Sequence, residues 1–137
     1  MTKRATAVRA QDVMSSPAVT LHPERSVSDA VEMLSANGFS AAPVVDGNGR
    51  LIGMVTEGDL VGDRVQRDAE TGDRAVTVGQ VMTRPAIGVT PDTDIRDVAR
   101  TMLADGVRSM PVVDAMGVIG VVARHDLVEL IAKGNMA

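Results

Sequence analysis

The sequence contains one segment twice in tandem, and this duplication limits the chain to folds in which two similar units lie together. Residues 12–49 align with residues 80–117 without a gap. The identical pairs include Met14 with Met82, Pro17 with Pro85, Pro23 with Pro91, Asp29 with Asp97, Gly38 with Gly106 and Pro43 with Pro111. After a single-residue deletion the matches continue with Ile52 and Ile119, Gly53 and Gly120, Val55 and Val122, Asp59 and Asp126, and Leu60 and Leu127. We therefore expect both copies to adopt the same fold.

Each copy is predicted to form a β-α-β-β-α unit, because short apolar runs alternate with amphipathic periods. In the first copy Val27, Ala30 and Leu34 recur at helical spacing after Ser26, a residue type that caps helix N-termini. The expected elements of this copy are a strand at Ala18–Leu21, a helix from Val27 to Asn37, strands at Pro43–Val45 and Leu51–Val55, and a helix beginning near Gly58. The second copy repeats this order, with a strand at Ala86–Val89, a helix between Asp94 and Asp105, and a last helix beginning near His125.

The expected fold class is α/β (α+β), with two tandem β-α-β-β-α repeats packed about a pseudo-twofold axis. A unit of about 60 residues buries too little surface to be stable alone, so the two copies should pack on each other. We assign the first repeat to residues 10–66, a linker to residues 67–77 and the second repeat to residues 78–133. The linker assignment rests on the polar run Arg67–Ala75.

Composition argues against several classes of function. The 137 residues carry a formal net charge of −4 without a large basic block, which makes nucleic acid an unlikely partner. There is no cysteine and there are only two histidines, so we expect no metal site. No apolar run approaches about 18 residues, which predicts a soluble cytoplasmic protein that does not enter a membrane. Because no nucleophile elbow, P-loop or HExxH motif occurs, we expect no enzymatic activity.

Three short motifs together resemble those of the CBS domain pair, also called a Bateman module. They are VM(S/T)xP at Val13–Pro17 and Val81–Pro85, PVVD at Pro43–Asp46 and Pro111–Asp114, and GMVTEGDL at Gly53–Leu60. The resemblance covers residues 10–133 and implies a regulatory module that binds an adenine nucleotide (AMP, ADP or ATP) in clefts between the repeats. Arginine greatly outnumbers lysine, which occurs only at Lys3 and Lys133, and this bias is typical of a GC-rich bacterial genome. The resemblance is to a stand-alone bacterial CBS domain protein.

The resemblance implies a first nucleotide site built around a G-x-x-T-x-x-D segment. Gly53, Thr56 and Asp59 match this pattern, with the threonine near phosphate and the aspartate accepting hydrogen bonds from the ribose hydroxyls. The adenine side of this site would be formed by Thr83, Arg84, Ala86, Val107, Arg108 and Ser109. Arg108 is placed to meet a phosphate.

The same resemblance implies a second site with an altered motif. Ala123 stands where the first copy has Thr56, while Asp126 keeps the ribose role available. The residues implied for this site are Arg124, His125 and Asp126 with Ser15, Ser16, Ala18, Phe39, Ser40 and Ala41. Arg124 and His125 lie at the start of a predicted helix, a region favourable to anions. Because the hydroxyl is missing here, the sequence favours the first site.

Local sequence leaves other interpretations open. Thr56 and Asp59 also fit a helix-capping pair, and Phe39 also fits core packing. The sensor hypothesis has S-adenosylmethionine or NAD as alternative ligands, and it includes a homodimer and an unidentified regulated protein. The alternative function is a dimerisation or docking module whose clefts stay empty. Binding can regulate only if the ligand prefers one of two states.

Overall fold

The computed structural model describes residues 8–70 and 76–134. Each copy contains one two-stranded antiparallel sheet and two longer helices. The first copy comprises α2 (Val27–Asn37), β1 (Ala41–Val45), β2 (Leu51–Thr56) and α3 (Glu57–Glu70). The second comprises α5 (Ile95–Asp105), β3 (Ser109–Asp114), β4 (Gly117–Ala123) and α6 (Arg124–Ala132). Short helices α1 (Ala10–Val13) and α4 (Val78–Val81) begin the first and the second copy.

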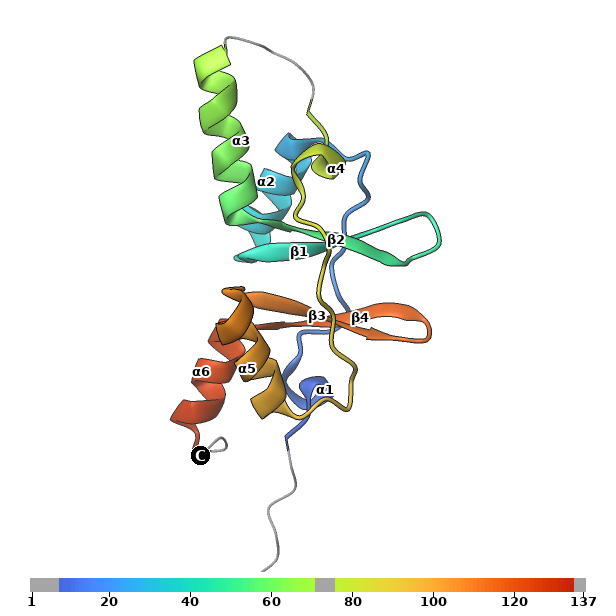
Figure 1. Ribbon diagram of the computed structural model, residues 1–137, viewed down its shortest axis with the longest axis vertical. Helices are drawn as coiled ribbons and strands as arrows, with labels where there is room; N and C mark the ends of the chain where they lie inside the picture. The colour runs from blue at the N-terminus through green and yellow to red at the C-terminus, as the bar shows by residue number, and fades with distance from the viewer. Residues whose placement is uncertain (1–7, 71–75, 135–137) are drawn as a thin grey trace, which may run out of the picture.

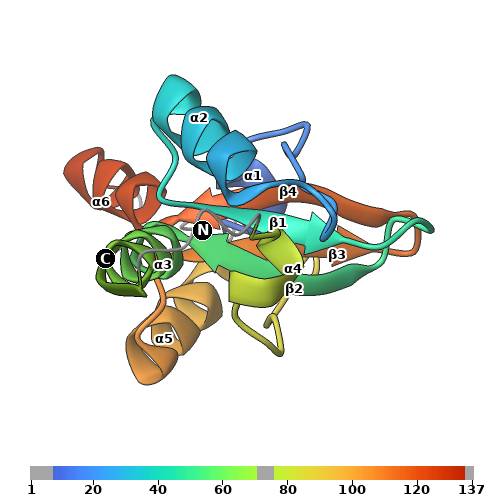
Figure 2. The ribbon, with the colours of Figure 1, turned by 90° about the horizontal axis from the view of Figure 1, so that it is seen from above.

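The two copies stack with their sheets adjacent and their helices at one end of the hairpins. In Figure 1 the β1–β2 hairpin lies directly above the β3–β4 hairpin, with α2 and α3 above and α5 and α6 below. Figure 2 shows the four longer helices spread around one end of the stacked hairpins, and the hairpin turns at the other end. This arrangement confirms the predicted α+β class with two similar repeats.

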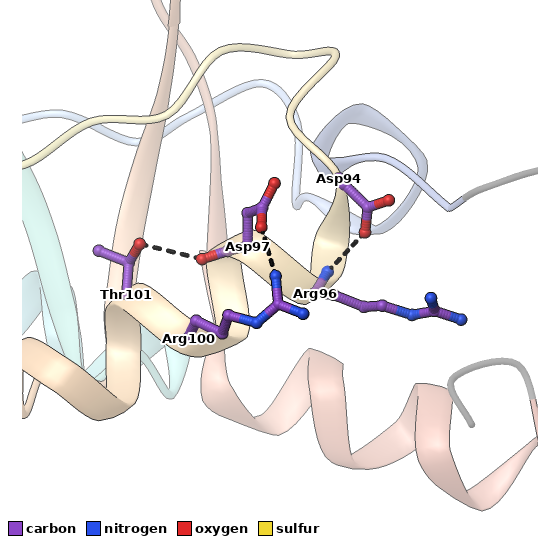
Figure 3. Close-up of polar contacts among 5 residues, drawn as sticks. All are labelled: Asp94, Arg96, Asp97, Arg100 and Thr101. Atoms are coloured by element: carbon purple, nitrogen blue, oxygen red, sulfur yellow. Dashed lines mark hydrogen bonds and ion pairs between the residues drawn. The ribbon is translucent and has the colours of Figure 1, made fainter.

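The predicted helices after Ser26 and Asp94 are confirmed, together with their caps. The Ser26 hydroxyl accepts from the Asp29 amide at 3.0 Å, and the Asp94 carboxylate accepts from the Arg96 amide at 2.8 Å. Figure 3 shows this second cap and, one turn later, the ion pair between Arg100 and Asp97 at 2.7 Å. Both helices bury their apolar stripe and end at a glycine with positive φ, Gly38 or Gly106.

The strands predicted at Ala18–Leu21 and Ala86–Val89 are wrong. Only Leu21 pairs, in parallel with Val44, and its amide donates to the Pro43 carbonyl at 2.9 Å. Val89 pairs with Val112 in the same way. The apolar residues before them line the clefts described below, Ala18 and Val19 in one and Ala86 and Ile87 in the other, so their apolar character does not reflect a sheet.

The span predicted as linker, residues 67–77, begins inside a helix. Helix α3 continues to Glu70, within the span predicted as linker, and the rest of that polar run lies outside the described residues until Val76.

The predicted hairpins are confirmed, and each contains a register shift near its turn. In the first turn the Asp46 carboxylate accepts from the amides of Arg50 and Asn48, and these bonds lower its pKa.

The core of each copy is closed by the short segment that begins the other copy. Ala10 on α1 is fully buried in the core of the second copy, where the Ile95 amide donates to the Val8 carbonyl at 2.9 Å. Val78 on α4 is equally buried in the first-copy core, and its amide donates to the Arg25 carbonyl at 2.7 Å. This exchange makes the two copies one folding unit, since neither core is complete without a segment of the other.

After α1 and after α4, the chain forms one isolated β-bridge with a strand of the other copy. Ser15 exchanges backbone hydrogen bonds with Val121 of β4, and Thr83 does so with Met54 of β2. A Cβ at Gly120 would lie 2.9 Å from the Ser15 carbonyl oxygen, closer than real Cβ contacts. A Cβ at Gly53 would lie 3.0 Å from the corresponding Thr83 oxygen. The glycine of each repeat motif therefore permits this close backbone approach.

Candidate functional site

Two clefts lie between the repeats where a strand of one copy meets the segment that follows α1 or α4. The first cleft has a volume of about 440 Å³ and includes Thr56, Thr83 and Ala86. The second has a volume of about 400 Å³ and includes Ser15, Ala18 and Asp126. Volumes of this order suit a small ligand of nucleoside size.

In the first cleft, Thr56 and Asp59 form the reciprocal cap of helix α3. The Thr56 amide donates to Asp59 Oδ2 at 3.0 Å, and the Asp59 amide donates to Thr56 Oγ1 at 3.1 Å. The capping interpretation left open by the sequence is therefore confirmed. The hydroxyl of Thr83 also donates to both carboxylate oxygens of Asp59, each at 3.1 Å. Asp59 is consequently occupied by two segments of the protein before any ligand is present.

The structure brings most of the residues predicted for the first site to one cleft. Those that line it are Thr56, Thr83, Ala86, Val107, Arg108 and Ser109. Asp59 lies behind Thr56 and Thr83, and Arg84 is exposed outside the lining. The sequence prediction did not include Ser40, Ala41, Met54, Glu57, Gly58, Pro85, Ile87 and Gly106, which also line it. Of these, Ile87 directly follows the predicted Ala86 in sequence, and the structure shows that it is an exposed apolar residue.

The second cleft contains nearly all of the residues predicted for it. Those in its lining are Ser15, Ala18, Phe39, Ser40, Ala41, Arg124, His125 and Asp126, whereas Ser16 is outside it. Phe39 also packs against the first-copy core, so both interpretations of this residue hold. The residues that the prediction omitted are Pro17, Val19, Asn37, Gly38, Arg108, Ser109, Val121 and Ala123.

The second cleft leaves its aspartate more available than the first. Asp126 Oδ2 accepts from the Ala123 amide at 2.7 Å, and this bond reproduces one half of the cap seen at Thr56 and Asp59. Within residues 8–70 and 76–134, no protein donor is recorded for Asp126 Oδ1. The Arg124 guanidinium donates to the Val107 carbonyl at 3.1 Å, which holds it at the cleft. The cleft thus combines a carboxylate oxygen that can accept further bonds with an anchored cation.

The two clefts differ in charge. The second is lined by Arg108, Arg124, His125 and Asp126, and His125 forms an ion pair with Glu129 at 3.2 Å when it is protonated. The charged residues in the lining of the first are Glu57 and Arg108. A phosphate group is therefore favoured in the second cleft, where two arginines can neutralise it.

Four residues form a wall common to both clefts: Ser40, Ala41, Arg108 and Ser109. The hydroxyls of Ser40 and Ser109 lie 3.2 Å apart and hydrogen-bond across the pseudo-twofold axis. The Ser40 carbonyl accepts from the Glu57 amide at 2.9 Å, and the Arg108 carbonyl accepts from the Arg124 amide at 2.7 Å. The wall is therefore fixed to the first residue of both α3 and α6.

The CBS domain model matches residues 10–64 and 78–133. The chain belongs to the CBS domain family. Its two repeats form a CBS domain pair, in agreement with the resemblance seen in the sequence. Among residues 8–70 and 76–134, no helix combines the length and apolarity needed to cross a membrane. The same part of the chain contains no group of three or more His, Asp or Glu side chains arranged to hold a metal ion.

Solved structures of other CBS domain pairs superpose on most of the chain. The CBS domain pair of MJ0100, in complex with 5′-methylthioadenosine and S-adenosyl-L-methionine, is 27% identical with a TM-score of 0.85, covering 94% of this chain and 99% of that one. CBSX2 in complex with AMP is 31% identical with a TM-score of 0.75, covering 91% of this chain and 96% of that one. CBSX2 comes from Arabidopsis thaliana.

Curated relatives vary in length. The CBS domain-containing protein YhcV of Bacillus subtilis is 27% identical over 117 residues, which are 85% of this chain and 81% of YhcV. The chain spans only 42% and 43% of two uncharacterised proteins of Methanocaldococcus jannaschii, MJ1225 and MJ0188. They are 27% and 32% identical to it and match 90% and 88% of its length.

Proposed function

We propose that this CBS domain pair is a regulatory module that binds adenosine-containing ligands in its two clefts, with AMP, ADP or ATP as the main class. The observation that carries the proposal is the second cleft, where a carboxylate oxygen without a recorded protein donor lies in one lining with two arginines. The neighbouring structures with AMP, or with 5′-methylthioadenosine and S-adenosyl-L-methionine, support the ligand class. S-adenosylmethionine and NAD are the alternative ligands.

In the second cleft each group has a proposed role. Asp126 accepts hydrogen bonds from the ribose hydroxyls, because an ionised carboxylate offers only acceptors. Arg124 and Arg108 neutralise the phosphate. The apolar surface of Ala18 and Val19 contacts the adenine ring. His125, at the start of α6, adds a further donor toward the phosphate.

In the first cleft, Thr56 and Asp59 have the corresponding roles beside Thr83 and Ala86. A ribose hydroxyl must compete with the Thr83 hydroxyl for the Asp59 carboxylate. Glu57 repels a phosphate, whereas it attracts a cationic adenosine compound and does not repel an uncharged one. We therefore rank the second cleft first for phosphorylated ligands, although the sequence motif alone favours the first.

Ligand binding is expected to raise the thermal unfolding midpoint, which far-UV circular dichroism can follow. AMP, ADP, ATP, S-adenosylmethionine and NAD would be compared with inorganic phosphate, which lacks the nucleoside. A ligand at about 100 times its Kd stabilises the native state by about 2.7 kcal/mol. If no adenosine compound shifts the midpoint further than phosphate does, the alternative of a docking module with empty clefts replaces the sensor.

The helices carry exposed apolar residues that suit contact with a second copy. These residues are Val31, Val61, Leu103, Val128 and Ile131. They come from α2, α3, α5 and α6, which lie at the same end of the stacked hairpins (Figures 1 and 2). We place a homodimer interface here, because burial of apolar side chains is the main driving force for association.

The double variant Val61→Glu, Val128→Glu is expected to shift sedimentation velocity from dimer to monomer. Val61 is 63% exposed and Val128 is 55% exposed, so the folded monomer tolerates charge at both positions, whereas an apolar interface does not. Met116→Glu is the matched control, since Met116 lies in the β3–β4 turn at the opposite end and is 88% exposed. Equal masses for the two variants would place the dimer elsewhere or exclude it.

The proposal contains no catalytic step, metal, nucleic acid or membrane contact. Its output passes through a separate regulated protein or through the homodimer, whose geometry would change with the ligand bound. A ligand can shift such an equilibrium only by its difference in affinity for the two arrangements. We also propose a cytoplasmic location, because adenine nucleotides are abundant there.

A further inference from the structure

The wall between the clefts contains one arginine that both clefts use. Arg108 is exposed and belongs to the lining of each cleft, while its counterpart in the first copy is Ser40. Within the described parts of the chain, no hydrogen bond or ion pair is recorded for the Arg108 guanidinium. Both clefts therefore have access to a single uncommitted cation on their common side.

We propose that Arg108 couples the two clefts, because one guanidinium can bind the phosphate of a ligand in either cleft but not in both at once. The main chain around it is fixed: the Arg108 carbonyl accepts from the Arg124 amide at 2.7 Å, and the buried Ser109 hydrogen-bonds to Ser40. The change between clefts is therefore a rotation of the Arg108 side chain alone. This inference rests on the proposed function and adds that a phosphorylated ligand in one cleft weakens the binding of a second phosphorylated ligand in the other.

Charge sets the order of occupancy. A phosphorylated ligand enters the second cleft first, because Arg124 lies there in addition to Arg108. Once Arg108 turns toward that phosphate, Glu57 is the charged residue left in the lining of the first cleft. The first cleft then disfavours a second phosphorylated ligand but still accepts adenosine without phosphate. Binding energies are linked reciprocally, so phosphate in the first cleft equally weakens the second.

Closing one cleft at a time makes this coupling measurable. Ala18 lines the second cleft and Ala86, the equivalent residue of the other copy, lines the first. Ala18→Trp and Ala86→Trp should each leave a single site, and the new tryptophan also reports binding by fluorescence, since the chain has none. AMP and adenosine would be titrated by calorimetry into both variants and into the intact protein.

Arg108→Ala is expected to weaken AMP about tenfold in each single-cleft variant, as loss of a charge-assisted hydrogen bond predicts. Adenosine affinity should stay unchanged. In the intact protein the second AMP should bind about tenfold more weakly than AMP binds to the first cleft alone in Ala18→Trp. The two adenosine steps should match their single-cleft values. Arg96→Ala is the matched control, because Arg96 is exposed and outside both linings.

The results separate this inference from the proposed function. Loss of AMP affinity in only one single-cleft variant on Arg108→Ala would overturn the coupling, as would an intact protein whose two AMP steps equal the single-cleft values. Both results leave nucleotide binding intact. If neither AMP nor adenosine binds the intact protein, the proposed function itself fails. Should a tryptophan variant not fold, the comparison of Arg108→Ala with the unmodified protein still tests whether the weaker AMP step depends on Arg108.

Discussion

Ala10→Asp is expected to lower the free energy of unfolding by about 3 to 5 kcal/mol, the cost of an unpaired charge in a core. Ala10 belongs to the first copy in sequence, but it is fully buried in the second-copy core beside Ile95 and Val98. An aspartate there must be either buried without an opposite charge or exposed by opening that core. Urea denaturation followed by far-UV circular dichroism measures the loss, because the chain lacks the tryptophan and tyrosine that fluorescence requires.

Gln11→Asp is the matched control for this prediction. Gln11 is the next residue on α1 and is exposed, so the same side chain there should change the stability by less than about 0.5 kcal/mol. Hydrogen exchange adds a second measurement: Ala10→Asp should speed exchange in α5 and β3 of the second copy before it does so in the first. Equal stability of the two variants would contradict the exchange of α1 between copies.

Asp126→Asn is expected to weaken AMP binding to the second cleft about tenfold or more, because a hydrogen bond to a charged group contributes about 1.5 to 3 kcal/mol. The amide oxygen of asparagine can still accept from the Ala123 amide, so the start of α6 should remain capped. Calorimetric titration in the Ala86→Trp background measures this cleft alone. The thermal midpoint without ligand should change little.

Two further variants define the specificity of this result. Asp105→Asn removes an exposed aspartate that lies outside both cleft linings, and it should leave AMP affinity unchanged. Asp59→Asn, measured in the Ala18→Trp background, should have a smaller effect than Asp126→Asn, since Asp59 already accepts from the Thr83 hydroxyl. If Asp126→Asn binds AMP as tightly as the unmodified protein, Asp126 has no role in ribose binding.

Local chemistry was sufficient to predict the helices and hairpins. Ser26 and Asp94 cap the helices that follow them, and Gly38 and Gly106 end those helices in the left-handed region. These signals depend on neighbours within a few residues, so they can be read without the tertiary structure. The strands predicted near Ala18 and Ala86 were wrong, because a short apolar run does not by itself distinguish a strand from a segment whose side chains line a cleft.

The assignment of ligand roles to individual residues remains a prediction, but its spatial part can be compared with the structure. The repeat motif placed Thr56 and Asp126 at clefts between the copies, as expected from the resemblance. It gave no indication that Thr83 occupies the Asp59 carboxylate or that Asp126 keeps one oxygen without a recorded protein donor. Those differences depend on contacts between residues far apart in the chain.

By itself the sequence determined that the protein is a duplicated CBS module, because the paired glycines, prolines and aspartates recur in order in both copies. Only the tertiary structure decided that Ala10 completes the core of the second copy and Val78 that of the first. It also decided that Arg108 lies in the wall between two clefts whose linings differ in charge. The physical reason is that an internal repeat specifies the fold of each unit. The role of a residue that differs between the units depends on what it contacts where the two units meet, which the repeat does not specify.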